Sequence, residues 1–202
     1  MPSDKFLHLE DEKKKKIIDA AKIEFANHRY EDASINQIIK NIQMPRGSFY
    51  LYFENKQDLY LYILKTYIQS FKIKFIDILN KNENDLFQSL ISFFDYIVNR
   101  DSDYDHNLIR NIFINMNSNQ VDIAIPKLVA DELDGSIINN INITNYNIKE
   151  EEKEVILSIV FPIFFHAVAT SLEHPLKKEA IRVHYLKQIN IIKRGLERKE
   201  IC

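Results

Sequence analysis

The chain has 202 residues, of which 46% are hydrophobic and 28% charged, which is enough for one sizeable core or for a small domain joined to a larger one. Three glycines and five prolines are too few for a β-sandwich or a nucleotide-binding α/β fold, and the composition also excludes collagen-like and mostly disordered chains. The net charge of −2 excludes a chain-wide basic surface, so any nucleic-acid site must be local. Because glycine and proline are so scarce, we expect an all-helical protein.

The first twelve residues are charged and lack the apolar stretch of about 7–15 residues that marks a secretory signal. A first helix is predicted over Lys13–Asn27, because apolar residues recur there at helical spacing. After a short loop, Ser34 with a glutamine three residues later forms the capping-box pattern, which predicts a second, short helix to about Asn41. Pro45 suits the first position of a third short helix that ends at Phe53.

Two short helices joined by a tight turn and preceded by a longer helix are the layout of a helix-turn-helix DNA-binding unit. The segment from Lys13 to about Leu64 also carries a set of residues at a characteristic spacing: Ile17-Ile18-Asp19-Ala20-Ala21 with Phe25, Tyr30, Ser34-Ile35 with Ile38, Gly47-Ser48-Phe49-Tyr50 with Tyr52-Phe53, Lys56 and Leu59. In these positions it closely resembles the N-terminal domain of TetR (tetracycline-repressor-like) transcriptional regulators.

The sequence departs from the family pattern in and beside the turn. Gln43 stands where a turn glycine is usual, so the turn is predicted to hold a non-glycine residue in the left-handed conformation. Arg29 likewise replaces a usual glycine in the preceding loop. Pro45 replaces a common serine or threonine, which removes one hydroxyl that could have bonded a phosphate.

The recognition helix carries the candidate DNA contacts. Arg46 offers a planar fork for guanine or for a phosphate, and Gly47 lets the backbone come close to the duplex. The resemblance implies that Tyr50, Tyr52 and the Lys56 amine contact the phosphate backbone, with Ser48 near the base edges or in internal packing. The candidate DNA-binding residues are Ser34, Arg46, Gly47, Ser48, Tyr50, Tyr52 and Lys56.

Local charge leaves two interpretations of the N-terminal lysine run open. Up to Tyr60 there are ten basic and ten acidic residues, so this part of the chain is neutral overall. Lys13–Lys16 is therefore either a concentrated patch of positive charge for DNA or simply the solvated start of a helix.

The remainder of the chain is also predicted to be helical, with Asp85 as a helix cap and Pro162 as the position of a kink. The further helices are expected over Lys56–Leu79, Leu86–Ile97, Leu108–Met116, Pro126–Ile143, Lys149–Glu173 and Lys177–Lys199, with a loop at Asp101–Asn107.

One stretch, Val155–Leu172, has no charged residue over roughly the length that a bilayer needs. We interpret it as a buried helix and expect no membrane span, because a helix that is apolar on all sides can also lie between a core and a partner subunit. The resemblance implies that the last two helices form a homodimer interface, as a four-helix arrangement between subunits.

Aromatic residues are dense in the second half of the chain, where they are usually ordinary core. The resemblance implies an apolar effector pocket, in which such residues would line the wall and a few polar groups would orient the ligand. His166 is either a satisfied core or interface histidine or a polar anchor in that pocket. The pocket candidates are Phe93, Phe94, Tyr96, Phe113, Met116, Phe161, Phe165 and His166.

No pattern indicates catalysis, a metal or a cofactor. The chain has no GxSxG motif, no P-loop and no histidine pair at ligand spacing. Its single cysteine, Cys202, excludes a disulfide framework, so a reducing cytoplasm is the expected compartment. Asp101, Asp103 and Asp105 resemble the start of a calcium loop, but the glycine and glutamate that such a loop requires are missing.

Taken together, the sequence predicts two domains. Residues 10–70 would form the DNA-binding domain, with the helix-turn-helix at about 33–52, and residues 71–202 the regulatory and dimerisation domain. The expected function is that of a dimeric repressor that binds a near-palindromic operator and is released by a small molecule. The alternative is a helical small-molecule or protein-binding module that does not read DNA.

Overall fold

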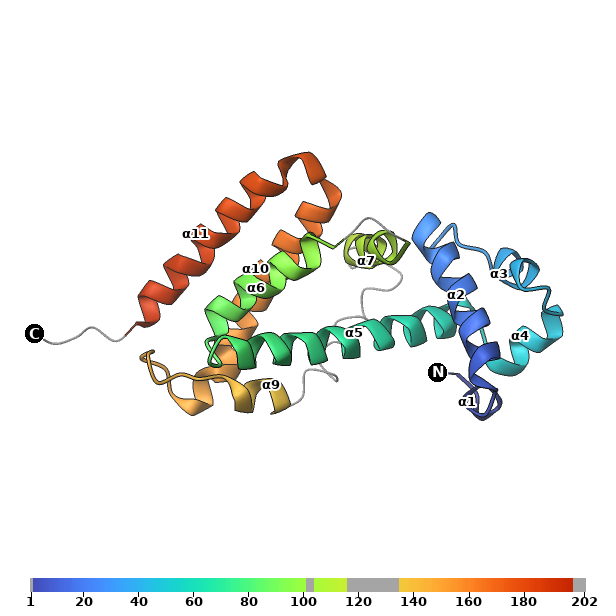
Figure 1. The fold of residues 1–202 in the computed structure, drawn as a ribbon, viewed down its shortest axis with the longest axis horizontal. Helices are drawn as coiled ribbons and strands as arrows, with labels where there is room; N and C mark the ends of the chain where they lie inside the picture. The colour runs from blue at the N-terminus through green and yellow to red at the C-terminus, as the bar shows by residue number, and fades with distance from the viewer. Residues whose placement is uncertain (1, 101–103, 116–134, 198–202) are drawn as a thin grey trace, which may run out of the picture. The chain divides into compact units, whose positions relative to one another are not determined.

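The computed structural model describes residues 2–100, 104–115 and 135–197 (Figure 1). Within these ranges the chain forms helices and no β-strand, which confirms the all-helical prediction. The helices are α1 (Asp4–Leu7), α2 (Asp11–Asn27), α3 (Ile35–Asn41), α4 (Arg46–Tyr52), α5 (Lys56–Lys81), α6 (Leu86–Val98), α7 (Tyr104–Asn115), α9 (Gly135–Asn140), α10 (Lys153–Glu173) and α11 (Lys178–Leu196), with 3-10 turns η1 (Glu150–Glu152) and η2 (Pro175–Lys177).

The chain divides into two compact units. The first comprises Met1–Gln69 and Asp101–Leu128, and the second Ser70–Arg100 and Val129–Cys202. Helix α5 therefore begins in the first unit and ends in the second.

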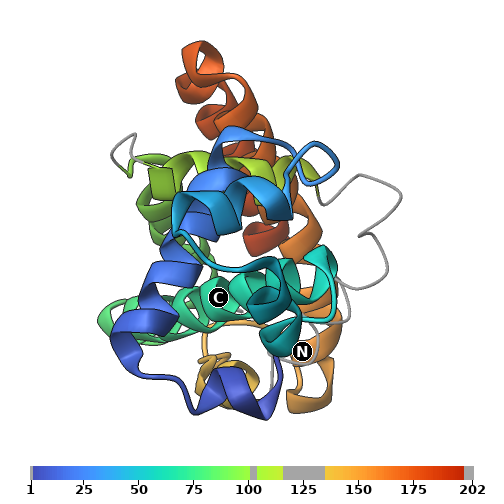
Figure 2. The same ribbon diagram turned by 90° about the vertical axis from the view of Figure 1, so that its right-hand side faces the viewer.

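The first unit contains the predicted helix-turn-helix, with α2, α3 and α4 facing the viewer in Figure 2. Its core is built on the apolar positions that the helical periodicity singles out. Phe25, Ile38 and Phe49 are each at most 1% exposed, as is Leu59 at the start of α5. Short helices such as α3 and α4 are stable only through this packing, because fewer than about a dozen residues do not hold a helix in water.

The start of α3 differs from the capping box that the sequence suggests. The Ser34 side chain makes no capping hydrogen bond, so the predicted capping box of Ser34 and Gln37 is wrong. Instead the Ser34 N–H donates to Oε1 of Glu24 at 2.8 Å. Glu24 is 4% exposed, and a buried carboxylate needs such donors, so this bond ties α2 to the start of α3.

The turn between α3 and α4 has the predicted left-handed residue. Gln43 has φ of 53°, and the N–H of Met44 donates to the carbonyl of Ile39 at 2.9 Å. This is the bond of a Schellman-type helix end, which normally uses glycine at the left-handed position. Pro45 is the N-cap of α4 and not its first helical residue, a shift of one position from the prediction.

Two helix boundaries were predicted incorrectly. The loop expected at Asp101–Asn107 is helical from Tyr104 onward, while residues 101–103 lie outside the described ranges. The helix expected from Pro126 is described only as α9, and its proposed end at Ile143 is not helical. There the Oδ1 of Asn142 accepts the N–H of Thr144 at 3.0 Å, a local side-chain bond that competes with helix.

The second unit packs α6, α10 and α11 together (Figure 1). The rings of Phe94 and Tyr185 stack with centroids 4.9 Å apart, and Phe164 from α10 lies at 6.4 Å from Tyr185. Both nitrogens of the Arg182 fork donate to the Asp95 carboxylate at 2.7 Å, which joins α11 to α6. The buried core and this bidentate ion pair fix the three helices against one another.

Helix α10 is apolar on more than one face. By length and composition, residues 150–173 are able to cross a membrane, and 39% of their most apolar window is buried inside the protomer. Val155 and Ile159 are 56% and 47% exposed, and the exposed Pro162 and His166 continue the same stripe along the helix. The prediction of a buried helix thus holds for one face of α10 only. The predicted kink at Pro162 stays a prediction.

Asp85 links three segments of the second unit. As predicted, it caps α6, accepting the N–H of Gln88 at 2.8 Å, and its other oxygen accepts the Tyr146 hydroxyl at 2.7 Å and the Lys193 ammonium at 3.5 Å. Partial burial alone would raise the pKa of Asp85, but these three donors outweigh burial and hold the pKa below its usual value. The ionised form is therefore favoured by the fold.

A pH dependence of stability follows from this lowered pKa. The ionised Asp85 contributes stability above about pH 4, near the pKa of an unfolded aspartate, and this contribution is lost as the pH falls through the lower folded value. Asp85→Asn keeps a good capping group but removes the charge. In urea unfolding we expect the variant to have a lower free energy of unfolding than wild type at pH 6. This difference should shrink as the pH falls below 4. A gap that stays constant to pH 3 would contradict the assignment.

Candidate nucleic-acid interface

Helix α4 buries one face and exposes the other. Phe49 is fully buried, whereas Arg46, Gly47 and Tyr50 are exposed. The Arg46 guanidinium lies over the Tyr50 ring, 5.9 Å from its centroid, so two of the predicted contact residues are held together on the exposed face. One face of this short helix is buried because Phe49 and Tyr52 point to the core of the first unit, whereas Leu51 is 49% exposed.

The two candidate serines are both half-buried. Ser48 lies on α4, and Ser34 precedes α3 with a hydroxyl that makes no capping bond. The Glu24 carboxylate accepts the backbone N–H of Ser34, and the Ser34 hydroxyl does not cap α3.

Tyr52 has a different environment from Tyr50. It is only 9% exposed, against 46% for Tyr50, and its ring lies at the edge of the Phe6 ring with centroids 6.2 Å apart. Tyr52 therefore contributes mainly to the packing of α4.

The Lys56 ammonium is held inside the first unit. It donates to the carbonyls of Tyr30, Glu31 and Ala33 at 2.6, 3.0 and 3.0 Å, and lies 4.7 Å from the Tyr30 ring centroid. An ammonium group has three N–H donors, so these bonds use all of them. Lys56 thus fastens the loop between α2 and α3 to the start of α5.

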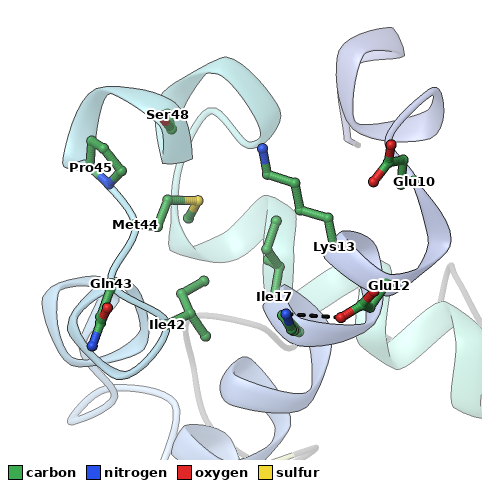
Figure 3. A pocket seen from close by; sticks show the side chains of 10 residues that line it. Glu10, Glu12, Lys13, Ile17, Ile42, Gln43, Met44, Pro45 and Ser48 are labelled. Atoms are coloured by element: carbon green, nitrogen blue, oxygen red, sulfur yellow. Dashed lines mark ion pairs between the residues drawn. The ribbon is translucent and has the colours of Figure 1, made fainter.

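A groove of about 440 Å³ lies between the first turns of α2 and the turn that leads into α4 (Figure 3). Its floor is apolar and its rim carries charged and polar groups. The lining residues are Glu10, Glu12, Lys13, Lys16, Ile17, Ile42, Gln43, Met44, Pro45 and Ser48.

The four lysines at the start of α2 have different surroundings. Lys14 pairs with Asp11 at 3.3 Å, and Lys16 pairs with Glu12 at 3.0 Å. Lys13 reaches into the groove towards the helix that carries Ser48 (Figure 3). Lys15 is exposed and is not part of the groove lining. Lys13 and Lys16 both line the groove, but Lys16 is paired with Glu12, and this distinguishes Lys13 from the other three lysines.

Asn111 of α7 closes the other end of α2, a role that the sequence did not predict. Its side-chain amide donates to the carbonyls of Phe25 and Ala26 at 2.8 and 3.0 Å. The last carbonyls of a helix lack partners within it, so this amide acts as a C-terminal cap from a segment some 85 residues away.

The proposed pocket residues do not all come together. In the second unit, Phe93 stacks on Phe164 at 5.4 Å and on Tyr96 at 6.2 Å, and Phe165 joins the same aromatic cluster. Phe94 and Phe161 also contact rings of this unit, whereas Phe113 belongs to the first unit and Met116 lies outside the described residues. His166 is exposed on α10, which excludes a core position within the protomer.

Within the part of the chain that the structure describes, two hydroxyls in the second unit are buried without a hydrogen-bond partner. They belong to Ser171 on α10 and to Tyr185 on α11, which are 2% and 0% exposed. Burial, with a smaller effect of Asp95, raises the pKa of Tyr185, so its hydroxyl stays protonated.

Comparison with known proteins gives two domain matches. Residues 17–63 match the family described as bacterial regulatory proteins, tetR family, and residues 85–196 match the tetracyclin repressor-like C-terminal domain. The chain belongs to the TetR family. It is therefore a DNA-binding transcriptional regulator of a non-enzymatic family, with a helix-turn-helix domain and a C-terminal helical domain.

Two solved structures have a similar fold, and a curated relative is similar over part of its length. A TetR family transcriptional regulator from Chloroflexus aurantiacus aligns over 98% of this chain and 100% of its own, with a TM-score of 0.51 and 23% identity. Reduced NemR from Escherichia coli aligns over 93% and 98%, with a TM-score of 0.62 and 11% identity, which is a likeness of fold. YuxN, an HTH-type transcriptional regulator of Bacillus subtilis, is 33% identical over 73 residues, which are 36% of this chain and a quarter of YuxN.

Proposed function

We propose that this TetR-family protein is a homodimeric repressor that binds a near-palindromic operator and releases it when a small molecule enters the C-terminal helical domain. The observation that carries the operator contact is the exposed face of α4, where Arg46 and Tyr50 lie together above a fully buried Phe49. A two-fold dimer would present two such faces to successive major grooves, about 34–36 Å apart.

The geometry suggests a division of roles among the candidate residues. Arg46 is free to turn its fork to a base edge, with Gly47 allowing close approach. We assign the hydroxyls of Ser34 and Tyr50 to phosphates. Ser48 is assigned to a phosphate as well, and not to the base edges that the resemblance implies, because it lines the groove beside α4. Tyr52 packs α4 and Lys56 fastens the loop between α2 and α3 to α5, so we assign the phosphate contacts to neither of them.

The groove beside α4 is proposed as the seat of one phosphodiester strand, with Lys13 as its cation. Each phosphate neutralised by a lysine releases counterions and steepens the salt dependence of binding. Glu10 and Glu12 on the same rim oppose DNA, and Lys16, which also lines the groove, is paired with Glu12. We therefore assign the contact to Lys13 and not to the whole lysine run.

Lys13→Gln is therefore expected to make the slope of log affinity against log salt less steep by about one unit per protomer. The matched control is Lys15→Gln, which removes the same charge from the same helix outside the groove and should change the slope less. Fluorescence anisotropy with an operator duplex at a series of salt concentrations measures both. Equal slopes for the two variants would count against the phosphate seat.

The dimer is proposed to form through α10 and α11. Large apolar side chains are exposed on both helices: Val155 and Ile159 in the apolar stripe of α10, and Val183 and Ile191 on α11. Exposed apolar patches often mark protein interfaces. A symmetric four-helix contact would cover both, and it would also place His166 at an interface. Insertion of α10 into a membrane is the competing explanation, and sedimentation in the absence of lipid would distinguish the two.

The effector is proposed to bind in the aromatic cluster of the second unit. Its rings would stack on an apolar molecule, and the unpartnered hydroxyls of Ser171 and Tyr185 would orient it. Because coupling between two sites is reciprocal, operator DNA must weaken effector binding by the same factor as the effector weakens DNA binding.

The experiment that tests the proposed function is the selection of bound fragments from the source genome by the purified protein, with competition in moderate salt. Recovery of one or a few palindromic sites is expected, because a specific regulator retains sequence-dependent affinity when its charge contacts are screened. Purely salt-sensitive, sequence-blind binding by ligand-free protein would overturn the proposal in favour of a helical module that does not read DNA.

A further inference from the structure

We propose that the N-terminal segment Ser3–Leu7 is a brace that positions the recognition helix α4, so that sequence-specific binding depends on residues outside the helix-turn-helix domain. The inference rests on the proposed function of α4 in reading the operator. The matched helix-turn-helix domain begins at residue 17, whereas this segment lies ten or more residues before it.

The first observation is a cap at the end of α4. The Ser3 N–H donates to the carbonyl of Tyr52 at 2.9 Å, and the Ser3 hydroxyl donates to the carbonyl of Leu51 at 2.6 Å. These are carbonyls of the last turn, which no residue within the helix can satisfy. One serine therefore closes the C-terminal end of α4 with two hydrogen bonds.

The second observation is the burial of Phe6, which α1 holds at 0% exposure. Its ring centroid lies 4.7 Å from that of Phe53 and 6.2 Å from that of Tyr52, at the end of α4. It also lies 5.4 Å from the ring of Tyr62 on α5. Phe6 thus packs between α4 and α5, with its ring edge-to-face to Tyr52 and Tyr62 and tilted against Phe53.

The length of α4 explains why such a brace has a function. The helix has seven residues, fewer than two turns, and a helix this short has almost no stability of its own. Its N-terminal end is set by the turn at Gln43 and its buried face by Phe49. The C-terminal end is held by α1. Losing that contact would let the base-reading face tilt while the unit stays folded.

Phe6→Ala and Leu7→Ala form a matched pair for the test. Both truncate a large apolar side chain of α1, but Leu7 is 49% exposed, whereas Phe6 is fully buried. With the full-length protein, we expect Phe6→Ala to lose at least tenfold in affinity for the selected operator duplex. Affinity for a scrambled duplex at low salt should stay within twofold, because charge contacts do not require an exact helix orientation. Leu7→Ala should match wild type on both duplexes.

Hydrogen exchange gives a readout that does not depend on DNA. The amide of Phe53, which donates to Phe49 at 2.9 Å, should exchange at least tenfold faster in Phe6→Ala, with the amides of α11 unchanged. Phe6→Leu should restore most of the protection and of the operator affinity. If Phe6→Ala does not fold, Ser3→Ala takes its place, because it leaves the contacts of the Phe6 ring intact. It is expected to show a smaller loss of amide protection and of operator affinity.

The outcomes separate the brace from the proposed function. Faster exchange with an unchanged ratio of operator to scrambled affinity would overturn the positioning role, and unchanged exchange would overturn the brace itself. If wild type selects no operator, the proposed function fails, and the exchange experiment still decides whether Ser3–Leu7 orders α4.

Discussion

Arg46→Ala is expected to abolish operator discrimination while leaving the dimer intact. Arg46 is exposed at the start of α4 and rests on Tyr50, so it can present both nitrogens of its fork to one base. A bidentate contact of this kind contributes about 1–3 kcal/mol against the wrong base, and a dimer places one in each half-site. Electrophoretic mobility shifts with operator and scrambled duplexes measure the loss as a ratio of affinities.

The control for this variant is Arg46→Lys. Lysine keeps the positive charge but lacks the planar fork, so sequence-blind binding should persist while discrimination falls. Sedimentation should find both variants as dimers, since α4 lies in the first unit and the proposed interface in the second. Unchanged discrimination in Arg46→Ala would show that the bases are read from elsewhere on the chain.

Ile159→Glu is expected to convert the dimer to monomer and to abolish operator binding with it. Ile159 is 47% exposed in the middle of the apolar stripe of α10, and the substitution would bury a carboxylate in each subunit. We expect the dimer dissociation constant to rise by about 100-fold or more, which corresponds to about 2.7 kcal/mol. Sedimentation across a concentration series measures this change.

The matched control is Ile73→Glu on α5. Ile73 is 70% exposed, so the same change of residue is made on an apolar side chain that is not on α10 or α11. This variant should remain a dimer and bind the operator as wild type does. If Ile159→Glu is also an unchanged dimer, the association surface lies away from the middle of α10.

Local signals account for what the sequence predicted correctly. The cap at Asp85 and the extent of α5 depend on residues within a few positions or on helical periodicity, whereas the left-handed Gln43 was predicted from the family resemblance. The family resemblance adds the identity of the recognition helix. For this reason the fold class was predictable before the structure, while the DNA contacts assigned to α4 stay a prediction.

The features that the sequence did not reveal depend on pairs far apart in the chain. Lys56 bonds carbonyls 23 to 26 positions away, and Asn111 bonds carbonyls of α2 some 85 positions away. Nothing in the spacing of a lone lysine or asparagine predicts such partners, since any backbone carbonyl can accept. Phe6 was missed for a related reason, because a helix of four residues has no periodicity to detect.

The cap that Asn111 places on α2 bears on how this protein could be recombined with its relatives. Helix α7 lies within the stretch that matches the C-terminal family domain, yet it packs in the first unit. In a chimaera joined within α5, the transferred α2 would no longer have Asn111 to cap its last carbonyls. Transplanting the operator specificity of this chain therefore requires grafting residues 104–115 together with the first 69, or installing a new cap for the carbonyls of Phe25 and Ala26.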